Sequence, residues 1–157
     1  MTPQWVDVAR LCREVLAEVR SATERAHDLV LSLADDPLDF VADQKVLRQI
    51  IGNLLTNAVK YSPGGGRVTL EAALADDKLV LRVNDQGIGI PATDRENLFE
   101  AFHRGTNVGK IPGSGLGLAI THNGVALHGG TITVDSTVDV GTTFEVRIPR
   151  MASPDRR

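Results

Sequence analysis

The segment 43–61 restricts the fold more than any other part of the sequence. Apolar residues recur every four positions, at 46/47, 50/51, 54/55 and 58/59, and this spacing predicts one long amphipathic helix. Asp43 is a typical N-cap residue, and the sequence SPGGG at 62–66 has to end the helix. A helix with such an apolar stripe needs a second layer to cover it, so we expect a layered fold.

The same helix carries a second stripe that is polar. Gln49, Asn53, Asn57 and Lys60 are spaced four, four and three residues apart and therefore share one side. The simpler interpretation is a solvated face. The alternative is a Mg²⁺–polyphosphate site, where an amide oxygen binds the cation and the ammonium neutralises phosphate. The stripe by itself leaves both interpretations open.

The remaining periodicity predicts further helices at 4–24, 92–98 and 115–127, and strands at 28–33, 38–42, 67–75, 78–84, 130–136 and 142–148. Asp35-Asp36-Pro37 separates the first two strands, which are predicted to form a hairpin. The glycine-rich segment 103–114 is predicted to be a loop. This order indicates an α/β two-layer (α+β sandwich) fold with a largely antiparallel sheet covered on one face.

Composition limits the class of protein. The 157 residues suit one domain, 1–150, followed by a disordered tail at 151–157, and the net charge of −3 gives no basic footprint for nucleic acid. Cys12 is the single cysteine, which excludes an internal disulfide and fits a reducing compartment. No apolar run approaches the roughly 20 residues of a membrane-spanning helix, and the N-terminus lacks the pattern of a signal peptide.

The sequence LVLRVNDQGIGIP, at 79–91, runs a predicted strand directly into a carboxylate and two glycines. Asp85 can accept a hydrogen bond from an exocyclic amine such as that of adenine, and Gly87 and Gly89 allow close backbone approach to a flat ligand. An Asx-type turn is the simpler explanation. It accounts for Asp85 and Gly87 but not for the second glycine and Pro91.

The sequence PGSGLGLAI, at 112–120, opens a helix with glycines, which exposes N–H groups that suit phosphate. Two other phosphate motifs are excluded. Residues 105–110 have three residues between the P-loop glycines instead of four, and Ile111 stands where Ser or Thr is needed. Residues 113–120 lack the third glycine of the dinucleotide pattern.

Taken in order, these segments resemble the ATP-binding catalytic domain of histidine kinases, in the superfamily shared with gyrase, MutL and the heat-shock chaperone ATPases. LRQIIGNLLTNAVKYSP looks like the N box, NDQGIGIP the first glycine box and LFEAFHR the F box. GSGLGLAI resembles the second glycine box and GTTFEVRIP the closing strand, so the resemblance covers about residues 5–149. It implies a Bergerat-type fold, in which a mixed five-stranded sheet is backed by three helices and ATP lies beneath a mobile lid.

The resemblance also implies roles for individual residues. Asn57 would coordinate Mg²⁺, while Asn53, Lys60 and the lid residue Arg104 would act on the phosphates and carry the transfer. Asp85 would accept from the adenine amino group, and Thr142 would reach the same end through water. The other implied contacts to nucleotide come from Tyr61, Gly87, Gly89, Ile90, Phe102, Lys110, Gly113, Gly115, Leu116, Gly117 and Leu118.

Asn53 separates two classes within that superfamily. The ATPases carry a glutamate four residues before the Mg²⁺-binding asparagine, where it activates water as a general base. An amide cannot take up that proton, so Asn53 favours phosphoryl transfer to histidine over hydrolysis.

No histidine of the chain begins the family's His-Glu/Asp-x-x-Thr-Pro pattern; the four are His27, His103, His122 and His128. The resemblance therefore implies a phosphoacceptor helical hairpin elsewhere in the same protein, acting in cis or in trans within a dimer, with a response regulator downstream. We expect a cytoplasmic domain, which includes the cytoplasmic part of a membrane-anchored sensor, without direct membrane or nucleic-acid contact. Two alternatives stay open: a non-catalytic ATP/ADP-sensing module, and a serine-directed kinase on the same scaffold.

One segment departs from the family's pattern. After GLGLAI the chain continues with Thr121-His122-Asn123-Gly124, where the family has a helical and often basic stretch. A glycine inside a helix costs about 1 kcal/mol, so we expect this helix to be weakened or kinked.

Overall fold

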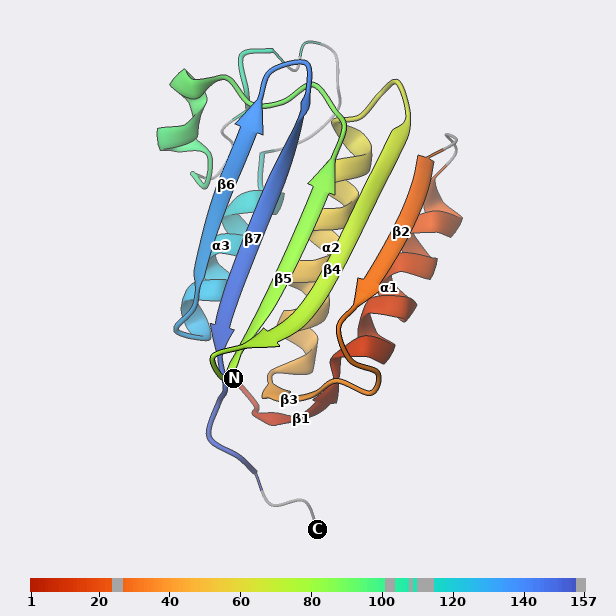
Figure 1. Ribbon diagram of the computed structural model, residues 1–157. Helices are drawn as coiled ribbons and strands as arrows, with labels where there is room; N and C mark the ends of the chain where they lie inside the picture. The colour runs from red at the N-terminus through yellow and green to blue at the C-terminus, as the bar shows by residue number, and fades with distance from the viewer. Residues whose placement is uncertain (24–26, 101–103, 108, 110–114, 155–157) are drawn as a thin grey trace.

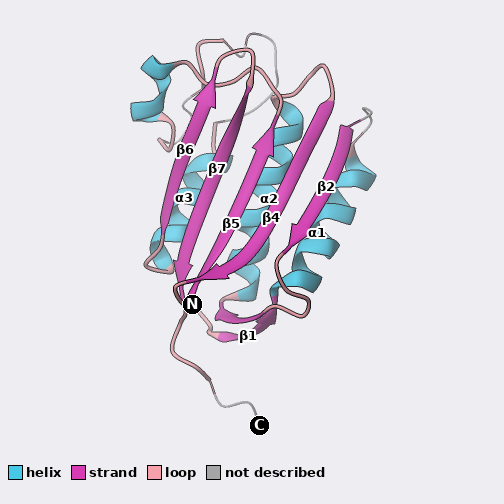
Figure 2. Ribbon diagram, viewed as in Figure 1, coloured by secondary structure: helices cyan, strands magenta, loops and turns pink. Residues whose placement is uncertain are grey.

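A computed structural model describes residues 1–23, 27–100, 104–107, 109 and 115–154. They form two layers, a five-stranded sheet and three α-helices that cover one of its faces (Figure 1). The helices are α1 (Val8–Ala22), α2 (Gln44–Lys60) and α3 (Gly117–Leu127). Figure 2 shows the same division, with the helices behind the strands in this view.

The sheet has the strand order β2-β4-β5-β7-β6. β2 pairs in parallel with β4, and every other neighbouring pair is antiparallel. The predicted mixed, largely antiparallel five-stranded sheet is therefore confirmed. The bounds are β2 (His27–Leu33), β4 (Gly66–Ala75), β5 (Lys78–Asp85), β7 (Gly141–Pro149) and β6 (Thr131–Thr137).

The predicted hairpin of strands 28–33 and 38–42 is wrong. β2 pairs with β4 over its whole length, while β3 (Asp39–Ala42) pairs antiparallel with β1 (Gln4–Asp7) in a separate two-stranded sheet. Both strands are short apolar runs next to a turn sequence, which is the local signal of a hairpin. Their partners lie far away in the sequence, so no local pattern identifies them.

The predicted helix 4–24 begins later, at Val8, because residues 4–7 form β1. Asp7 is the N-cap, and its carboxylate accepts the N–H of Arg10 at 3.3 Å. The apolar residues of β1 continue the helical spacing of α1. Periodicity alone therefore predicts a helix that begins several residues before the true start of α1.

The core lies between α2 and the central strands. Leu47, Ile50, Ile51, Leu54 and Leu55 are at most 1% exposed, which confirms the four-residue period predicted for this helix. They belong to the same buried cluster as apolar residues of β4 and β5, among them Val68, Leu70, Leu79 and Leu81. Full burial of each such side chain stabilises the fold by about 1.5–3 kcal/mol.

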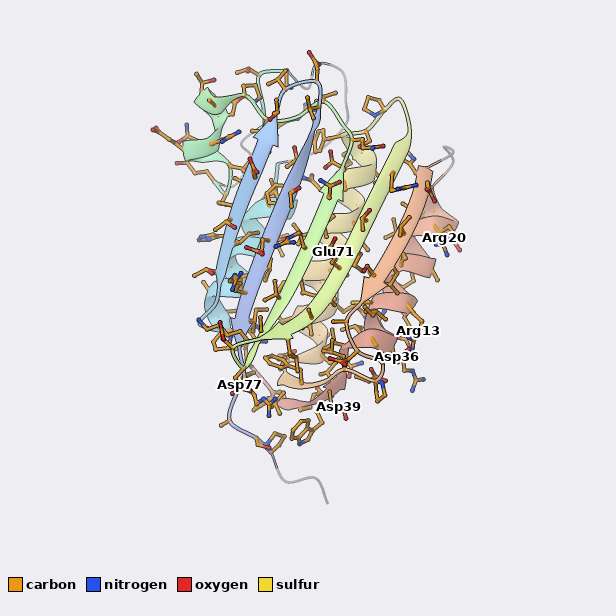
Figure 3. All side chains as sticks on the ribbon, in the orientation of Figure 1. Arg13, Arg20, Asp36, Asp39, Glu71 and Asp77 are labelled. Atoms are coloured by element: carbon orange, nitrogen blue, oxygen red, sulfur yellow. The ribbon has the colours of Figure 1, made fainter. Side chains whose placement is uncertain are left out.

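The other face of the sheet is polar. Arg82 on β5 contacts Glu71 on β4 at 3.4 Å and Glu145 on β7 at 2.6 Å. Glu71 is labelled on the side turned toward the viewer in Figure 3, which is the side without helices. This face carries charge pairs across strands and suits contact with water.

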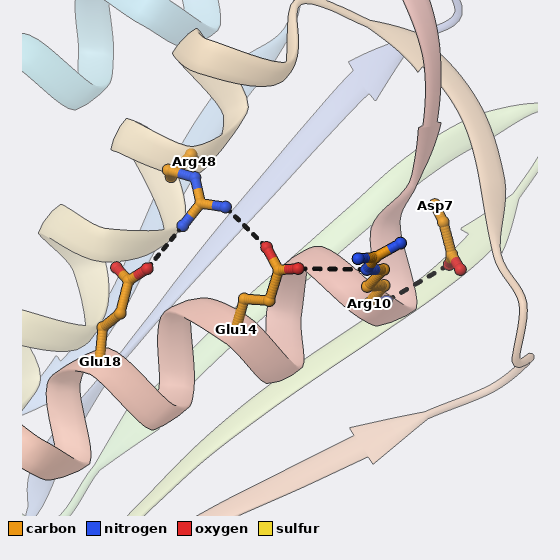
Figure 4. A network of polar contacts seen from close by, with 5 residues as sticks. All are labelled: Asp7, Arg10, Glu14, Glu18 and Arg48. Carbon is orange, nitrogen blue, oxygen red and sulfur yellow. Dashed lines mark hydrogen bonds and ion pairs between the residues drawn. The ribbon is translucent and has the colours of Figure 1, made fainter.

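Charged residues also join α1 to α2 on the outer surface of the helix layer (Figure 4). Arg48 of α2 contacts Glu14 at 2.7 Å and Glu18 at 2.8 Å, and Glu14 also contacts Arg10 at 3.1 Å. These side chains are more than a third exposed, and such pairs contribute at most about 1 kcal/mol each. The network orients the two helices but does not replace the core beneath them.

Gly124 serves a packing contact between α3 and α2. The helix continues through it to Leu127, and a Cβ added there would lie 3.0 Å from Val46 and 3.3 Å from Ile50. The close approach of the two helices thus explains the glycine. The expected weakening or kink is not seen as a break in α3, which continues to Leu127.

His128 joins the end of α3 to the start of α2 and therefore has a structural role. Its Nδ1 donates to the carbonyl of Gly124 at 2.9 Å, while Nε2 accepts the N–H of Asp43 at 3.1 Å. This donor assignment follows because the Gly124 carbonyl can only accept and the Asp43 N–H can only donate.

The ends of the described chain lie at one end of the sheet, opposite the C-terminal end of α2 (Figure 1). Met151 donates its N–H to Val41 at 3.1 Å, so the chain remains attached to β3 just beyond β7. The disordered tail stays a prediction, and residues 155–157 are outside the described part. Among the helices that the structure describes, none is both long and apolar enough to span a membrane.

The contact at Gly124 predicts the effect of a large side chain there. Gly124→Leu should lower the free energy of unfolding by about 1–3 kcal/mol, because the leucine overpacks the space in front of Val46 and Ile50. Asn123→Leu introduces the same side chain at an exposed neighbouring position and serves as the control. Urea unfolding measures both, and equal stability of the two variants would contradict the packing role.

Candidate functional site

One cleft lies among the C-terminal half of α2, the loop after β5, and the start of α3. It encloses about 980 Å³ between its walls, part of which is open to solvent. Its walls are formed by Asn53, Thr56, Asn57, Lys60, Tyr61, Asp85, Ile88, Gly89, Ile90, Leu98, Arg104, Gly105, Asn107, Gly115, Gly117, Leu118, Thr142 and Phe144.

The polar stripe of α2 forms one wall of this cleft. Asn53, Asn57 and Lys60 all line it, whereas Gln49 at the other end of the stripe is exposed. The side-chain nitrogen of Asn53 is buried and has no hydrogen-bond partner among the residues that the structure describes. A buried amide donor that lacks a partner is costly, so the cleft is built with a group that a ligand acceptor would satisfy.

The end of β5 supplies a carboxylate. Asp85 is 7% exposed, and its Oδ1 accepts the N–H of Gly87 at 2.9 Å. Burial raises the pKa of Asp85 from 3.8 to about 6, while hydrogen bonds from the backbone amides of Gly87 and Thr142 act in the opposite direction. Asp85 is therefore a poorly solvated acceptor, and an amine donor from a ligand would favour its ionised form.

The loop after β5 requires glycine at two positions, because neighbouring backbone atoms leave no room for a Cβ. A Cβ at Gly87 would lie 2.1 Å from the carbonyl oxygen of Tyr61, which accepts the N–H of Ile88 at 3.0 Å. Gly89 has a φ of +73°, and its Cβ would lie 2.4 Å from the carbonyl of Thr137. These contacts hold the loop against the end of α2 and the end of β6.

Residues 104–107 are attached to the 3₁₀-helix and to the loop that follows β5. Thr106 donates both its N–H and its hydroxyl to Asp94, each at 3.0 Å, and Asp94 belongs to the 3₁₀-helix Ala92–Asn97. Asn107 donates its side-chain amide to the carbonyl of Gly89 at 3.1 Å. In this arrangement Arg104 and Asn107 both face the cleft as lining residues.

The structure brings most of the predicted site residues together. Twelve of them line the cleft: Asn53, Asn57, Lys60, Tyr61, Asp85, Gly89, Ile90, Arg104, Gly115, Gly117, Leu118 and Thr142. Gly87 and Leu116 are not among the lining residues; Gly87 contacts Tyr61 and Leu116 is the N-cap of α3. Phe102, Lys110 and Gly113 lie outside the described residues. The ligand contacts of all these residues stay predictions.

Six lining residues were not predicted from the sequence: Thr56, Ile88, Leu98, Gly105, Asn107 and Phe144. Two of them had a usable signal. Thr56 follows Asn53 by three residues on the same helix face, and Phe144 follows Thr142 by two residues on the same strand face. Leu98 and Asn107 come from irregular segments, where spacing carries no such information.

The donor set of the cleft fits a hard cation only together with a ligand. No group of three or more His, Cys, Asp or Glu side chains that could hold a metal ion occurs among the residues that the structure describes. The amide oxygen of Asn57 is an acceptable Mg²⁺ ligand, and the remaining ligands of such an ion would be phosphate oxygens and water.

Comparison with known proteins gives one family. The domain family described as "Histidine kinase-, DNA gyrase B-, and HSP90-like ATPase" matches residues 42–152. The sensor histidine kinase WalK of Bacillus subtilis is 35% identical over 150 residues, which cover 93% of this chain and 24% of WalK. The sensor-like histidine kinase SenX3 of Mycobacterium tuberculosis is 36% identical over 148 residues, covering 93% of this chain and 36% of SenX3.

Solved structures agree with this match. The chain titled "Mycobacterial sensor histidine kinase MprB" superposes with a TM-score of 0.84 at 33% identity, covering 94% of this chain and 98% of that one. The curated relatives are much longer, since this chain spans about a quarter of WalK.

The short distance between Gly87 and the Tyr61 carbonyl predicts that any side chain at position 87 destabilises the fold. Gly87→Ala should lower the free energy of unfolding by several kcal/mol, on the order of 3, because the new Cβ meets the Tyr61 carbonyl at 2.1 Å. Gly64→Ala is the matched control, since nothing lies within 4 Å of a Cβ there. Thermal unfolding compares the two, and a wild-type melting temperature for Gly87→Ala would refute the contact.

The buried carboxylate predicts a pH-dependent stability. The pKa of Asp85 is about 6 in the folded protein and 3.8 ordinarily. Between pH 3.8 and pH 6, Asp85 is therefore mostly protonated in the folded protein and mostly ionised in the unfolded chain. The stability it contributes is therefore present below the lower value and lost as the pH rises through the higher one, by about 3 kcal/mol.

Asp85→Asn removes this titration. The unfolding free energy of the variant minus that of wild type should increase by about 2 kcal/mol between pH 4 and pH 7. Urea unfolding at several pH values measures the difference, in which the other carboxylates cancel. A difference that stays constant with pH would show that Asp85 is not poorly solvated.

Proposed function

The chain belongs to the histidine kinase-, DNA gyrase B- and HSP90-like ATPase family, and from this premise we propose that its cleft binds Mg·ATP and supplies the γ-phosphoryl group to a histidine of another domain. The observation that carries the proposal is the joining, in one cleft, of the Asp85 carboxylate with the amides and the lysine of α2. The rest of the proposal assigns a physical task to each group.

Asp85 and the apolar walls suit the adenine ring. Ile88, Ile90, Leu98, Leu118 and Phe144 line the same cleft as Asp85. A flat base gains from apolar contact on its faces, while its exocyclic amine donates to the carboxylate. Because Asp85 is already held by the amide of Gly87 at 2.9 Å, its direction is fixed before the ligand arrives.

The α2 stripe suits a metal-bound triphosphate. The Asn57 oxygen would hold Mg²⁺ when it is bound, and the metal would then neutralise phosphate charge and orient the phosphoryl group. Lys60 adds a positive charge to the same wall, and the Asn53 nitrogen, which has no partner in the described part of the chain, would gain a phosphate acceptor. These groups position charge, which is the main contribution of proteins to phosphoryl transfer.

None of the described residues that line the cleft is suited to act as a base for water. Asp85 is the one carboxylate among its described lining residues, and its Oδ1 already accepts a backbone amide. Asn53 occupies the position at which the ATPases of this family carry glutamate, and an amide does not accept a proton. Transfer to an incoming nucleophile is therefore favoured over hydrolysis.

The nucleophile has to come from outside the described cleft. His27 contacts the Ser62 carbonyl at 2.8 Å, His122 stacks on Phe99 at 5.1 Å, and His128 joins two helices. None of these three lines the cleft, and His103 is outside the described residues. The proposed acceptor is a histidine on a helical hairpin of the same protein, in cis or in trans, with a response regulator receiving the phosphoryl group afterwards.

The role of Asn57 is tested by calorimetric titration with ATP in the presence and absence of Mg²⁺. Asn57→Ala should lower Mg·ATP affinity at least about tenfold by removing a metal ligand, and should leave Mg²⁺-free ADP binding nearly unchanged. Gln49→Ala removes the amide at the exposed end of the same stripe and should bind like wild type. A wild-type chain that binds neither ADP nor Mg·ATP would overturn the proposed function.

The reaction is tested by adding the phosphoacceptor hairpin to the domain with labelled ATP. The proposal requires label on histidine, which is labile to acid and stable to base. Acid-stable label would instead indicate serine as the acceptor. Tight ATP binding with no transfer to the hairpin would indicate a nucleotide-sensing module.

A further inference from the structure

Ser136 is a buried hydroxyl one layer behind the cleft. It lies on β6, is 7% exposed, and is not among the lining residues. Its Oγ accepts the N–H of Ile90 at 2.8 Å, donates to the carbonyl of Gly141 at 3.1 Å, and lies 2.8 Å from the hydroxyl of Thr142. The side chain of Arg95 donates to its carbonyl oxygen, which holds the backbone of Ser136 in place.

These contacts determine the direction of the hydrogen bond between the two hydroxyls. A serine hydroxyl has one hydrogen and two acceptor lone pairs. The Ile90 N–H takes one lone pair, and the Gly141 carbonyl, which can only accept, takes the hydrogen. The remaining lone pair of Ser136 can only accept, so Thr142 donates its hydrogen to Ser136. In no other arrangement are all three contacts hydrogen bonds.

The direction matters because Thr142 lines the cleft next to Asp85. The two residues are partners in the β5–β7 pairing, and both are lining residues. With its hydrogen turned toward Ser136, the Thr142 hydroxyl offers only lone pairs to a ligand, and ionised Asp85 does the same. A water between them would donate to both and turn its own lone pair toward the base.

We propose that Ser136 is a positioning residue that fixes Thr142 as an acceptor and thereby selects purines with an amine, and not an oxygen, at position 6. This inference rests on the proposed function of the cleft as an ATP site. An adenine amine meets acceptors at Asp85 and Thr142, or at a water between them. A 6-oxo base places an acceptor at position 6 against these acceptors, supplies them no hydrogen from that position, and therefore binds less tightly there.

The probe is the ratio of the affinities for ADP and for inosine diphosphate, measured by calorimetry on each protein. The two nucleotides share ribose and phosphates and differ only in the base, so a general loss of stability or of phosphate binding cancels in the ratio. Wild type should prefer ADP.

Ser136→Ala frees the hydrogen of Thr142, so the preference for ADP should shrink by about tenfold, the equivalent of one hydrogen bond. Thr133→Ala removes a hydroxyl from an exposed position of the same strand and should keep the wild-type ratio. Ser136→Cys, whose sulfur accepts hydrogen bonds weakly, is the second variant if the alanine does not fold, and it should also shrink the ratio.

Thr142→Val tests whether Ser136 acts through Thr142. This variant should lower the ratio by itself, and adding Ser136→Ala to it should change the ratio no further. A wild-type ratio in Thr142→Val or in folded Ser136→Ala would overturn the inference, as would additive effects in the double variant. These outcomes differ from failure of the proposed function, in which wild type binds neither nucleotide.

Discussion

The candidate site depends on one backbone contact between the helix layer and the sheet. The carbonyl of Tyr61, at the end of α2, accepts the N–H of Ile88 just beyond the end of β5 at 3.0 Å. α2 carries the amides and the lysine, and β5 carries the carboxylate. This contact therefore fixes the position of the α2 groups relative to the carboxylate. It is possible only because Gly87 has no Cβ, which would lie 2.1 Å from the same oxygen.

The sequence was sufficient to predict α2 from its local pattern, and the mixed five-stranded sheet from the resemblance to the histidine kinase domain. α2 has a buried apolar residue in every turn, an N-cap at Asp43 and a glycine-rich stop, and these signals agree with one another. The pairing of β2 and β3 could not be predicted in the same way. Each pairs with a strand distant in the sequence, and a short apolar run beside a turn is equally compatible with a hairpin.

The residues of the site could likewise be predicted only in part. Asn53, Asn57, Lys60 and Asp85 were found because helical spacing and a strand end place functional groups in recognisable positions. Ser136 was not found, since its importance lies in three hydrogen bonds to residues from β7 and from the loop after β5. The direction of a hydroxyl is a property of the packed structure, and only its partners decide it.

The same cleft also separates binding from reaction. Under the proposed function its described groups hold a base, a metal and phosphates, yet none of them is suited to activate water, and none of the described histidines lines it. Under the proposed function this is an advantage, because a domain that retained a general base at position 53 would hydrolyse ATP before an acceptor arrived. An amide at that position keeps the phosphoryl group until a nucleophile with its own reactivity enters. The identity of that nucleophile, and not the cleft itself, then determines where the phosphoryl group goes.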